Sequence, residues 1–498
     1  MSVEREVKLP VAPAFRVPAL VGLPGGARAV DRGSSTLHTV YYDAPDLRLL
    51  RAGASLRYRE GQGWTVKLPP VRRAPALARE ELGFPDDGGV VPSDALALLR
   101  AYLRSADVVP VLRLRTERAR VDIEVGERVV AELSDDAVEI VAGGPGRVRF
   151  RELEVERTHD DADPTGDAVV EAVVERLRAA GAAAPDPTPK PARALGSLAT
   201  APADVVVPEL PAVPTAGDVV RHAVASSVLH LVRHDPVVRL GTDVEGVHQM
   251  RVATRRLRSD LRTFRPLVDE AWTRSLRDEL GWLGDALGTA RDADVLLGRI
   301  RGRIASIDET ERPATAGIVE ALERRAKEAH AALADVLASD RYVDLLDALV
   351  VAANAPSFTP AAAGPADAAL APLVRRPWKR LRRSARAAQR RPSAERLHRA
   401  RIDAKRLRYA SETVAVVVGE PARRVAARAE AVQDVLGEHQ DAIVALSWLR
   451  SWSSGASADG AFAAGVLADR ELSAAADARE RWRHAWRRLE RRKLRSWM

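Results

Sequence analysis

The first part of the chain is a series of short segments in which apolar and polar residues alternate. This period of two predicts β-strands, and glycine-rich turns at residues 61–63 and 143–146 separate several of the segments. An amphipathic helix is expected to follow at Gly166–Ala180. The expected strands are Val3–Leu9, Ser55–Arg59, Trp64–Leu68, Val111–Arg115, Arg128–Leu133 and Arg147–Glu156.

The pattern changes near residue 210. Beyond Thr215 the apolar residues take helical spacing, which predicts an all-helical region to Met498 with breaks near 356–377 and 453–460. The segment before it is rich in Pro and Ala and has the composition of a linker. We therefore expect an α+β multidomain chain with a strand domain at 1–198, a linker at 199–214 and a helical domain at 215–498.

The helical half repeats itself. The eleven residues from His248 to Arg258 resemble those from His398 to Arg408, which lie 150 residues later. Downstream, Leu287-Gly288 followed by Asp292 is matched by Leu436-Gly437 followed by Asp441. Two blocks in the same order at nearly the same offset indicate a duplication, so we expect two homologous bundles at about 215–355 and 365–498.

Each copy of the repeat predicts a helix with one strongly basic face. On a helical wheel the apolar residues of the first copy lie opposite a stripe that begins at His248 and continues through arginines. Like charges at this spacing cost a few tenths of a kcal/mol per pair, a cost that a bound anion would remove. Guanidinium groups bind phosphate oxygens in pairs. A solvated basic face stays open as an alternative, as does neutralisation by Asp285, Asp292 and Asp294.

Charge and composition narrow the choice of partners. The 498 residues carry 77 Lys and Arg against 69 Asp and Glu, a net charge of +8 that favours polyanionic partners. Aromatic residues make up 4%, which leaves few stacking platforms for nucleic acid. The absence of Cys excludes disulfides and thiolate chemistry. A charged start and the lack of a long apolar run make a membrane association unexpected and a cytoplasmic location the expectation.

The expected strands also carry acids and bases on one face, opposite apolar positions. Glu4, Glu6 and Lys8 share a face of the first strand, and Glu152 and Glu154 share a face of the last. Mixed charges on many strands favour a closed sheet with a polar lumen. In such a lumen, basic groups can clamp a triphosphate, and carboxylates can hold Mg²⁺ or Mn²⁺.

These strand motifs resemble the CYTH family, the triphosphate tunnel metalloenzymes. The resemblance rests on Glu4-x-Glu6-x-Lys8, Tyr41-Tyr42-Asp43, Leu56-Arg57-x-Arg59, Thr65-Val66-Lys67, Glu152-x-Glu154 and a closing segment with Lys190 and Arg193. It implies an eight-stranded antiparallel tunnel. Asp136 is preferred to Asp135 for the lumen because it shares the parity of Glu132. The resemblance implies metal ligation by Glu4, Glu6, Glu152, Glu154 and Asp136, and phosphate clamping by Lys8, Arg57, Arg59, Lys67, Arg113 and Arg115.

The duplicated basic motif resembles the conserved-histidine α-helical domain, CHAD. That family implies two pseudo-symmetric helical bundles and binding of inorganic polyphosphate along a basic surface. The residues that would take this role are His248, Arg251, Arg255, Arg256, Arg258, Arg262, His398, Arg401, Lys405, Arg406 and Arg408.

Together the two resemblances imply a metal-dependent hydrolase that converts inorganic tripolyphosphate to pyrophosphate and phosphate. The helical half would bind long-chain polyphosphate and could place the protein on polyphosphate granules. Two other functions stay open: a non-catalytic polyphosphate-binding protein, and a hydrolase or cyclase that acts on an organic triphosphate. The sequence does not indicate the oligomeric state.

Overall fold

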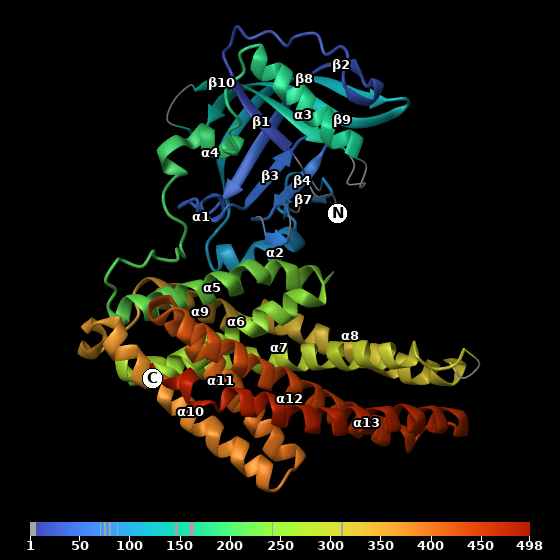
Figure 1. Ribbon diagram of the computed structural model, residues 1–498. Helices are drawn as coiled ribbons and strands as arrows, with labels where there is room; N and C mark the ends of the chain where they lie inside the picture. Colours follow the sequence, from blue (N-terminus) through green and yellow to red (C-terminus); the bar gives the residue numbers. More distant parts are fainter. Residues whose placement is uncertain are drawn as a thin grey trace. The chain divides into compact units, whose positions relative to one another are not determined.

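The chain forms two compact units, Met1–Asp204 and Val205–Met498. The computed structural model describes residues 6–69, 71–73, 76–78, 81–86, 88–144, 148–158, 164–241, 243–309 and 312–498, so Glu4 lies outside the described residues. The first unit contains the strands and the second is helical (Figure 1). The expected fold class is confirmed: an eight-stranded antiparallel sheet precedes a helical region. The division between the units falls inside the segment expected to be a linker.

The sheet of the first unit has the strand order β1-β10-β9-β8-β2-β3-β4-β7, and all its neighbours are antiparallel. Its strands are β1 (Glu6–Val11), β2 (Arg28–Asp43), β3 (Ser55–Arg59), β4 (Gly63–Lys67), β7 (Glu81–Phe84), β8 (Val109–Val125), β9 (Arg128–Ala142) and β10 (Arg149–Arg157). The short strands β5 (Val71–Arg73) and β6 (Ala76–Ala78) form a separate pair. Gly126, at φ +64°, makes the tight turn between the long strands β8 and β9.

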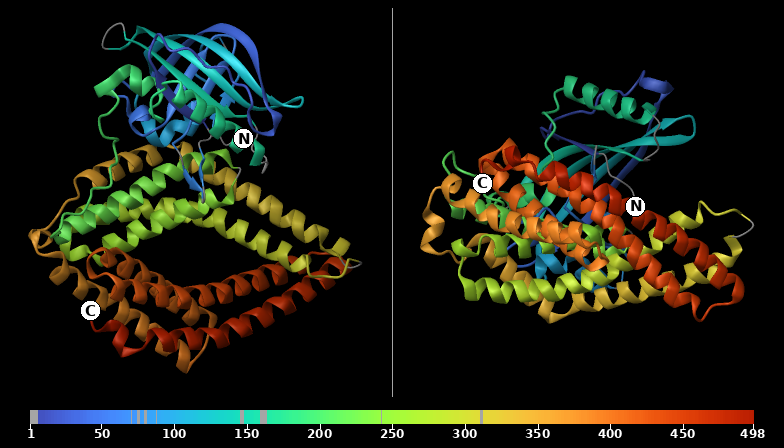
Figure 2. Two further views of the ribbon diagram at one scale, coloured as in Figure 1. Left: turned by 45° about the horizontal axis from the view of Figure 1, so that its top comes forward. Right: turned by 60° about the horizontal axis from the view of Figure 1, so that its bottom comes forward.

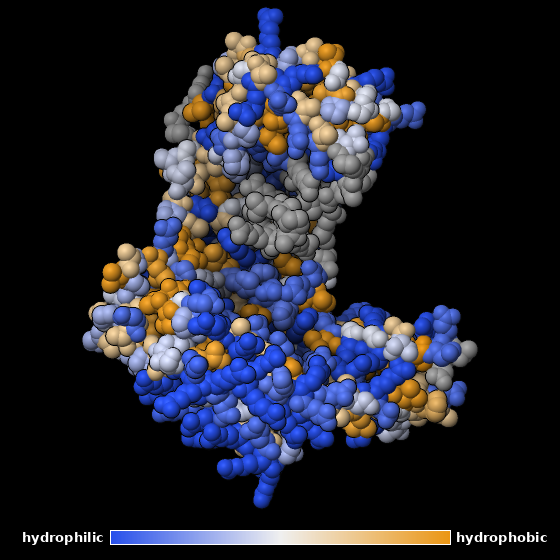
Figure 3. All heavy atoms as spheres, in the orientation of Figure 1, coloured by the Kyte–Doolittle hydropathy of each residue, from blue (hydrophilic) through white to orange (hydrophobic). Residues whose placement is uncertain are grey.

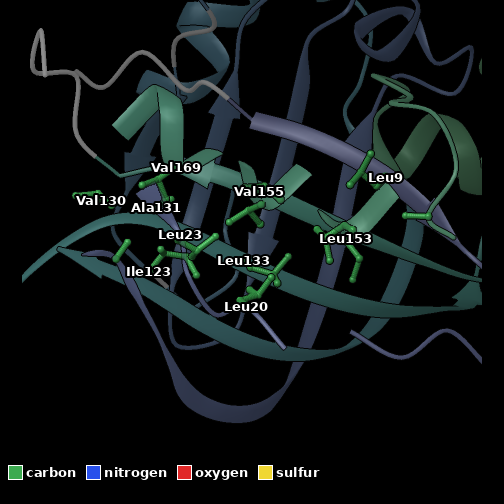
Figure 4. Packing of buried hydrophobic residues seen from close by; sticks show 14 residues of the cluster. Leu9, Leu20, Leu23, Ile123, Val130, Ala131, Leu133, Leu153, Val155 and Val169 are labelled. Carbon is green, nitrogen blue, oxygen red and sulfur yellow. The ribbon is translucent and has the colours of Figure 1, made fainter. Parts of the chain in front are cut away.

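Within the described residues of this unit, four α-helices accompany the sheet, and one of them covers its outer face. They are α1 (Arg48–Arg51), α2 (Ser93–Leu103), α3 (Pro164–Ala179) and α4 (Lys190–Leu195). Helix α3 begins and ends close to the expected limits of 166 and 180. Figure 4 shows Val169 of α3 among the apolar side chains of the strands, including Leu153 and Leu133.

This core fixes the direction of the charged side chains. Leu9 and Leu153 are fully buried in it, and each is followed or preceded along its strand by a charged residue, Lys8 or Glu154. Because side chains alternate between the two faces of a strand, packing the leucines against α3 turns Lys8 and Glu154 to the opposite face. The outer apolar layer therefore determines which charges face the interior.

The second unit consists of nine α-helices in its described residues, arranged as two related sets (Figure 2). The first set is α5 (Ala216–Leu240), α6 (Val244–Thr263), α7 (Glu270–Ile304) and α8 (Ala316–Ala338), followed by α9 (Asp340–Asn354). The second set is α10 (Ala366–Arg390), α11 (Ala394–Val418), α12 (Glu420–Ser453) and α13 (Ala458–Leu489). Helix α10 continues through Pro372 and Pro377, so the break expected there is shorter than the sequence suggests.

The two basic helices begin at side-chain caps and pack against each other. Asp243 accepts a hydrogen bond from the backbone N–H of Glu245 at the start of α6, and Ser393 accepts one from that of Arg396 at the start of α11. Between α6 and α11, the Thr413 hydroxyl donates a hydrogen bond of 3.0 Å to the buried carboxylate of Asp260. The duplicated motifs thus meet along one interface.

The packing of α3 on the sheet makes a testable prediction. Leu153→Ala would leave a cavity in a fully buried site, and we expect the free energy of unfolding of the first unit to fall by about 2–5 kcal/mol. Differential scanning calorimetry should show an earlier first transition. Val141→Ala is the control because Val141 is 60% exposed, and it should leave the transition unchanged. Equal effects of the two substitutions would contradict this packing.

Candidate functional site

The interior of the sheet contains a cavity of about 400 Å³. Residues of β1 at one edge of the strand order and of β4 and β7 at the other edge line this same cavity, so the sheet is curled into a tunnel. Most of the lining is charged, with both signs present. The charged lining residues are Glu6, Lys8, Arg51, Arg57, Arg59, Lys67, Glu81, Arg118, Glu154, Glu156 and Lys190.

One side of the cavity is a compact network of acids and bases. Lys190 Nζ, at the start of α4, lies 2.8 Å from Asp136 Oδ2, 3.0 Å from Glu152 Oε1 and 2.6 Å from Glu154 Oε1. Lys8 Nζ lies 2.7 Å from Glu154 Oε1 and 3.2 Å from Glu6 Oε1. Four carboxylates therefore share two ammonium groups.

The network keeps Glu154, Lys8 and Lys190 ionised. Burial raises the pKa of Glu154, but Lys190 and Lys8 outweigh burial and hold that pKa well below its usual range. Burial lowers the pKa of Lys8 and of Lys190, but their carboxylate neighbours raise both above the ordinary lysine value. Arg118 also donates to Asp136 and to Glu154, at 2.7 and 3.0 Å. The fold thus buries charge in matched sets.

The opposite side of the cavity is cationic. Arg57 and Lys67 both form ion pairs with Glu81. Arg59 donates to the Thr39 hydroxyl at 3.0 Å, and within the described part of the chain no carboxylate lies at ion-pair distance from it. Burial and then the neighbouring Arg57 lower the pKa of Arg59 to about 10. An anion in the cavity would relieve this strain on Arg59.

The carboxylates fit a hard divalent cation. Glu6 and Glu154 line the cavity, and both oxygens of Glu152 are buried and accept no hydrogen bond, although Lys190 lies near one of them. Among the described residues no group of three or more His, Asp or Glu is arranged around a single point. Magnesium usually takes only one or two protein carboxylates and completes its octahedron with waters and phosphate oxygens. Glu6 and Glu154 supply that number.

Two expected clamps lie elsewhere. Arg113 and Arg115 are exposed on the opposite face of β8, contrary to the prediction that they point into the tunnel. Their neighbours Leu112 and Leu114 take the inward positions because this end of the tunnel is an apolar core that includes Ala194 and Leu195 of α4. Arginine and leucine alternate along this part of β8, and because the core contains the leucines, the arginines must face outward.

Further along β8, Arg118 takes the inward position that the sequence reasoning did not assign. Arg118 is paired in register with Asp136, which is fully buried on the cavity side, while Asp135 faces outward and pairs with Arg151. The pairing register of β8 with β9 would have identified this residue, because Arg118 lies directly opposite Asp136 and its side chain therefore points to the same face. Glu81, Glu156 and Lys190 also line the cavity without having been assigned to the site.

In the helical unit, glycines let arginines lie against the neighbouring helix. A Cβ at Gly288 would lie 3.5 Å from Arg251 Nη2, and one at Gly437 would lie 3.5 Å from Arg401 Nε. These glycines are the ones in the two Leu-Gly motifs, so the repeat pairs an arginine of the basic helix with a gap on the next helix. Arg251 also forms an ion pair of 3.2 Å with Asp292.

Four cations gather where α6 meets α11. Burial, Arg255, Arg401 and Arg251 lower the pKa of Lys405 to about 6, and Asp441 is the acidic group that opposes them. The pKa values of Arg255 and Arg401 are also lowered, first by burial. The buried Nε–H groups of Arg255 and Arg401 have no acceptor. We call Arg251, Arg255, Arg401 and Lys405 the central cluster.

The remaining residues of the basic motif differ in their partners. Arg256 pairs with Glu412, Arg406 with Asp403, and Arg408 with both Glu412 and Glu430. His248 is half-buried, and His398 contacts Gln440 through Nδ1 at 2.9 Å. Of the acidic residues considered as neutralising groups, Asp292 pairs with Arg251, whereas Asp294 pairs with His330.

Other features of the structure carry less chemistry. A second cavity, of about 700 Å³, lies between η4 (Arg312–Thr315), α8, α12 and α13, and Asp459 is the one charged side chain among its described lining residues. None of the helices in the described ranges is both long and apolar enough to cross a bilayer.

The two units match known domains. The CYTH domain matches residues 2–184 and the CHAD domain matches residues 222–450. The chain is 32% identical to uncharacterized protein Rv2226 of Mycobacterium tuberculosis strain H37Rv, over 98% of this chain and 96% of that protein. Uncharacterized protein MT2285 of strain CDC 1551 matches with the same identity and coverage.

Solved structures resemble part of the chain. PptA from Streptomyces chartreusis is 24% identical with a TM-score of 0.48 and covers 55% of this chain and 99% of its own. The CHAD domain from the plant Ricinus communis is 27% identical with a TM-score of 0.48 and covers 58% of this chain and 96% of its own.

The chain therefore belongs to the family of proteins that join a CYTH domain to a CHAD domain. Its strand unit is a triphosphate-tunnel domain of that family, and its helical unit is the CHAD domain.

The central cluster predicts a cost in stability that depends on pH. Between pH 6 and 10.5 the unfolded chain binds a proton that folded Lys405 lacks, so this group's contribution to stability rises with pH over that window and is lowest below pH 6. Lys405→Met should therefore stabilise the ligand-free helical unit at pH 6, by more than about 1.4 kcal/mol, the equivalent of one pKa unit.

Melting temperatures measured from pH 6 to pH 9 should show the gap between variant and wild type narrowing as the pH rises. Lys327→Met is the control because Lys327 is exposed on α8, and it should have no such effect. A gap that is absent at pH 6, or that widens with pH, would refute the clustering of like charges around Lys405.

Proposed function

We propose that the tunnel hydrolyses inorganic tripolyphosphate to pyrophosphate and phosphate, with Mg²⁺ or Mn²⁺ as the cofactor, and that the helical unit binds long-chain polyphosphate. The observation that carries the proposal is the two-sided cavity. Arg57, Arg59 and Lys67 lie on one side of it, and Glu6 and Glu154 lie on the other. Membership of the CYTH and CHAD families supports the same class of substrates.

The roles of the tunnel residues follow from their charge. Arg59, Arg57 and Lys67 would bind the oxygens of the triphosphate, with Arg118 and Lys8 completing the cationic lining. The divalent ion would be held by Glu6 and Glu154, and it would supply charge neutralisation on the phosphoryl oxygens. Asp136 and Glu152 are buried beneath them and orient Lys190 and Arg118.

The reaction needs no covalent intermediate. The oxygen of water forms a bond to a terminal phosphorus, the bond from that phosphorus to its bridging oxygen breaks, and pyrophosphate leaves. The proton of the water passes to the phosphate products or to solvent. In the transition state, negative charge is spread over the oxygens of the transferred phosphoryl group and of the leaving pyrophosphate. Fixed cations around the cavity stabilise that charge and so favour the transition state.

The cavity favours an inorganic triphosphate over an organic one. Among its described lining residues Tyr41 supplies the only aromatic ring, and a nucleoside or thiazole group would need further apolar and stacking contacts. Neighbouring Arg57 and Arg59, Lys67 and Arg118 instead provide charge around the cavity. Hydrolysis of an organic triphosphate, or cyclase chemistry, is the second candidate and is decided by the same assay with other substrates.

The helical unit contributes by binding substrate-like chains on the same polypeptide as the tunnel. The excess of cations in the central cluster, and the buried Nε–H groups of Arg255 and Arg401 that have no acceptor among the described residues, suit a chain of phosphates. Linking two binding modules in one chain raises the effective concentration of each ligand near the other, to about millimolar for a short linker. The location on polyphosphate granules is part of this proposal.

The tunnel offers a matched pair of variants for testing catalysis. Arg59→Gln removes a cation that faces the cavity, and we expect the rate of phosphate release from tripolyphosphate with Mg²⁺ to fall by about 10²–10³-fold. Arg113→Gln removes a cation of the outer face, and it should retain the wild-type rate. Phosphate is measured by colorimetry, with chelator as a further control. Equal losses in the two variants would count against a tunnel active site.

Polyphosphate binding is tested separately. Arg255→Gln combined with Arg401→Gln removes two central cations, and we expect the dissociation constant for fluorescently labelled long-chain polyphosphate to rise at least about tenfold. Arg483→Gln, on the exposed face of α13, should change it little. Fluorescence anisotropy gives both values. Unchanged binding by the double variant would remove the central cluster from the proposal.

A further inference from the structure

The two copies of the basic helix pair differ in charge at several equivalent positions, and one of these lies at the interface of α6 and α11. Counted at the offset of 150 residues, Arg262 of α6 corresponds to Glu412 of α11, and Arg256 corresponds to Arg406. On one side of the interface Arg256 and Glu412 form an ion pair of 3.1 Å. On the equivalent side Arg406 faces Arg262, so repulsion replaces the ion pair between the helices, although Arg406 also pairs with Asp403 of its own helix at 2.9 Å. Equivalent residues in the two copies can therefore be compared directly within one protein.

The side with Arg262 concentrates positive charge. Burial, together with the nearby charges of Arg406, Arg277, Arg380 and Arg258, lowers the pKa of Arg262 to about 10. Within the described ranges neither Arg262 nor Arg258 has a carboxylate at ion-pair distance, and the buried Nε–H of Arg277 has no acceptor. Arg262 and Arg380 are exposed, so a ligand can reach them.

A second pair of equivalent arginines, Arg258 of α6 and Arg408 of α11, also differs in its carboxylate partners. Arg258 of α6 lies against Gly281, where a Cβ would be 3.3 Å from its Nη2 atom. Its equivalent in α11, Arg408, forms ion pairs of 3.1 Å with Glu412 and 2.8 Å with Glu430. One copy therefore leaves its arginine open to an external anion, and the other copy neutralises it with two carboxylates.

Arg380, which α10 contributes to the cationic side, has a neutral residue at the equivalent position of the first copy. Helices α5 and α10 have the same length and begin 150 residues apart, so His230 corresponds to Arg380. Burial and then His234 lower the pKa of His230, which leaves it neutral near pH 7, and its Nε2 contacts Gln249 at 3.0 Å. The cationic side thus has no counterpart across the pseudo-symmetry.

We propose that polyphosphate leaves the central cluster along one side only, over a cationic arm formed by Arg258, Arg262, Arg277, Arg380 and Arg406, and that Glu412 and Glu430 close the equivalent side. This inference rests on the proposed binding of polyphosphate. A pseudo-symmetric surface would bind a chain equally in both directions, whereas this one gives the bound chain a single exit. Figure 3 shows that hydrophilic side chains cover the face of the helical unit around α10 and α11.

A solvated basic face would show the same charges without a ligand. It would not explain why Glu412 and Glu430 neutralise Arg408 while the equivalent Arg258 has no such partner among the described residues, nor why the buried Nε–H of Arg277 has no acceptor there. If the basic face were only solvated, removal of an arginine from the cationic arm and from the equivalent side would change polyphosphate binding equally. The equivalent residues Arg258 and Arg408 therefore separate the alternatives.

The experiment measures binding of end-labelled long-chain polyphosphate to the full chain by fluorescence anisotropy, across a range of salt concentrations. Arg258→Gln and Arg262→Gln should each weaken binding about tenfold and reduce its dependence on salt. Arg408→Gln should change it less than about twofold, because Arg408 is already neutralised. Circular dichroism confirms that each variant is folded.

A gain-of-function variant completes the test. Glu412→Gln combined with Glu430→Gln opens the second arm, and we expect it to bind long chains about tenfold more tightly while short chains bind as before. Loss of binding in Arg408→Gln equal to that in Arg258→Gln, or no gain in the double variant, overturns the one-sided path. If the wild-type chain itself does not bind polyphosphate, the proposed function fails instead.

Discussion

The strand unit depends on one buried cation. Lys190 sits within 3.0 Å of three carboxylates, two of which are fully buried. Without it, Asp136 would retain only Arg118 as a cationic partner and Glu152 only the more distant Arg193, and incompletely compensated charges in the interior are costly. Because Lys190 is at the start of α4, it links the helix that fills one end of the tunnel to the acidic strands.

The helical unit treats charge in the opposite way. Its central cations have too few carboxylates, and burial together with mutual repulsion depresses the pKa of Lys405 to about 6. The repulsion between these cations reduces the stability of the unit in the absence of a ligand, and an anion that binds there would remove this cost. The two units therefore differ in their charge: a cavity lined by both acids and an excess of cations suits one small anion together with a metal ion, and a basic surface with few carboxylates suits a long polyanion.

The sequence predicted much of this arrangement because its patterns are local. The alternation of Lys8 with Leu9 and of Leu153 with Glu154 places acids and bases on one face of the strands, and the duplicated motif identifies α6 and α11. What could not be predicted depends on packing between distant segments. Strand β2 was missed because its first half is polar and largely exposed, and it is stabilised by pairing with β8.

The same limit explains what the sequence could not show at the sites. Arg113 and Arg115 face outward because Leu112 and Leu114 are needed in the apolar core beneath α4, which the strand pattern alone does not reveal. The neutralisation of Arg408 depends on Glu430, which belongs to a different helix from the basic motif. In both cases the deciding partner is distant in sequence.

The most direct test of the central claim is phosphorus NMR of tripolyphosphate incubated with the full chain and Mg²⁺. The account predicts that the resonance of the middle phosphate disappears while pyrophosphate and phosphate appear in equal amounts, and that chelator stops the change. A spectrum that keeps the middle phosphate, with lines broadened by binding alone, would contradict a catalytic tunnel and leave a protein that only binds phosphate chains.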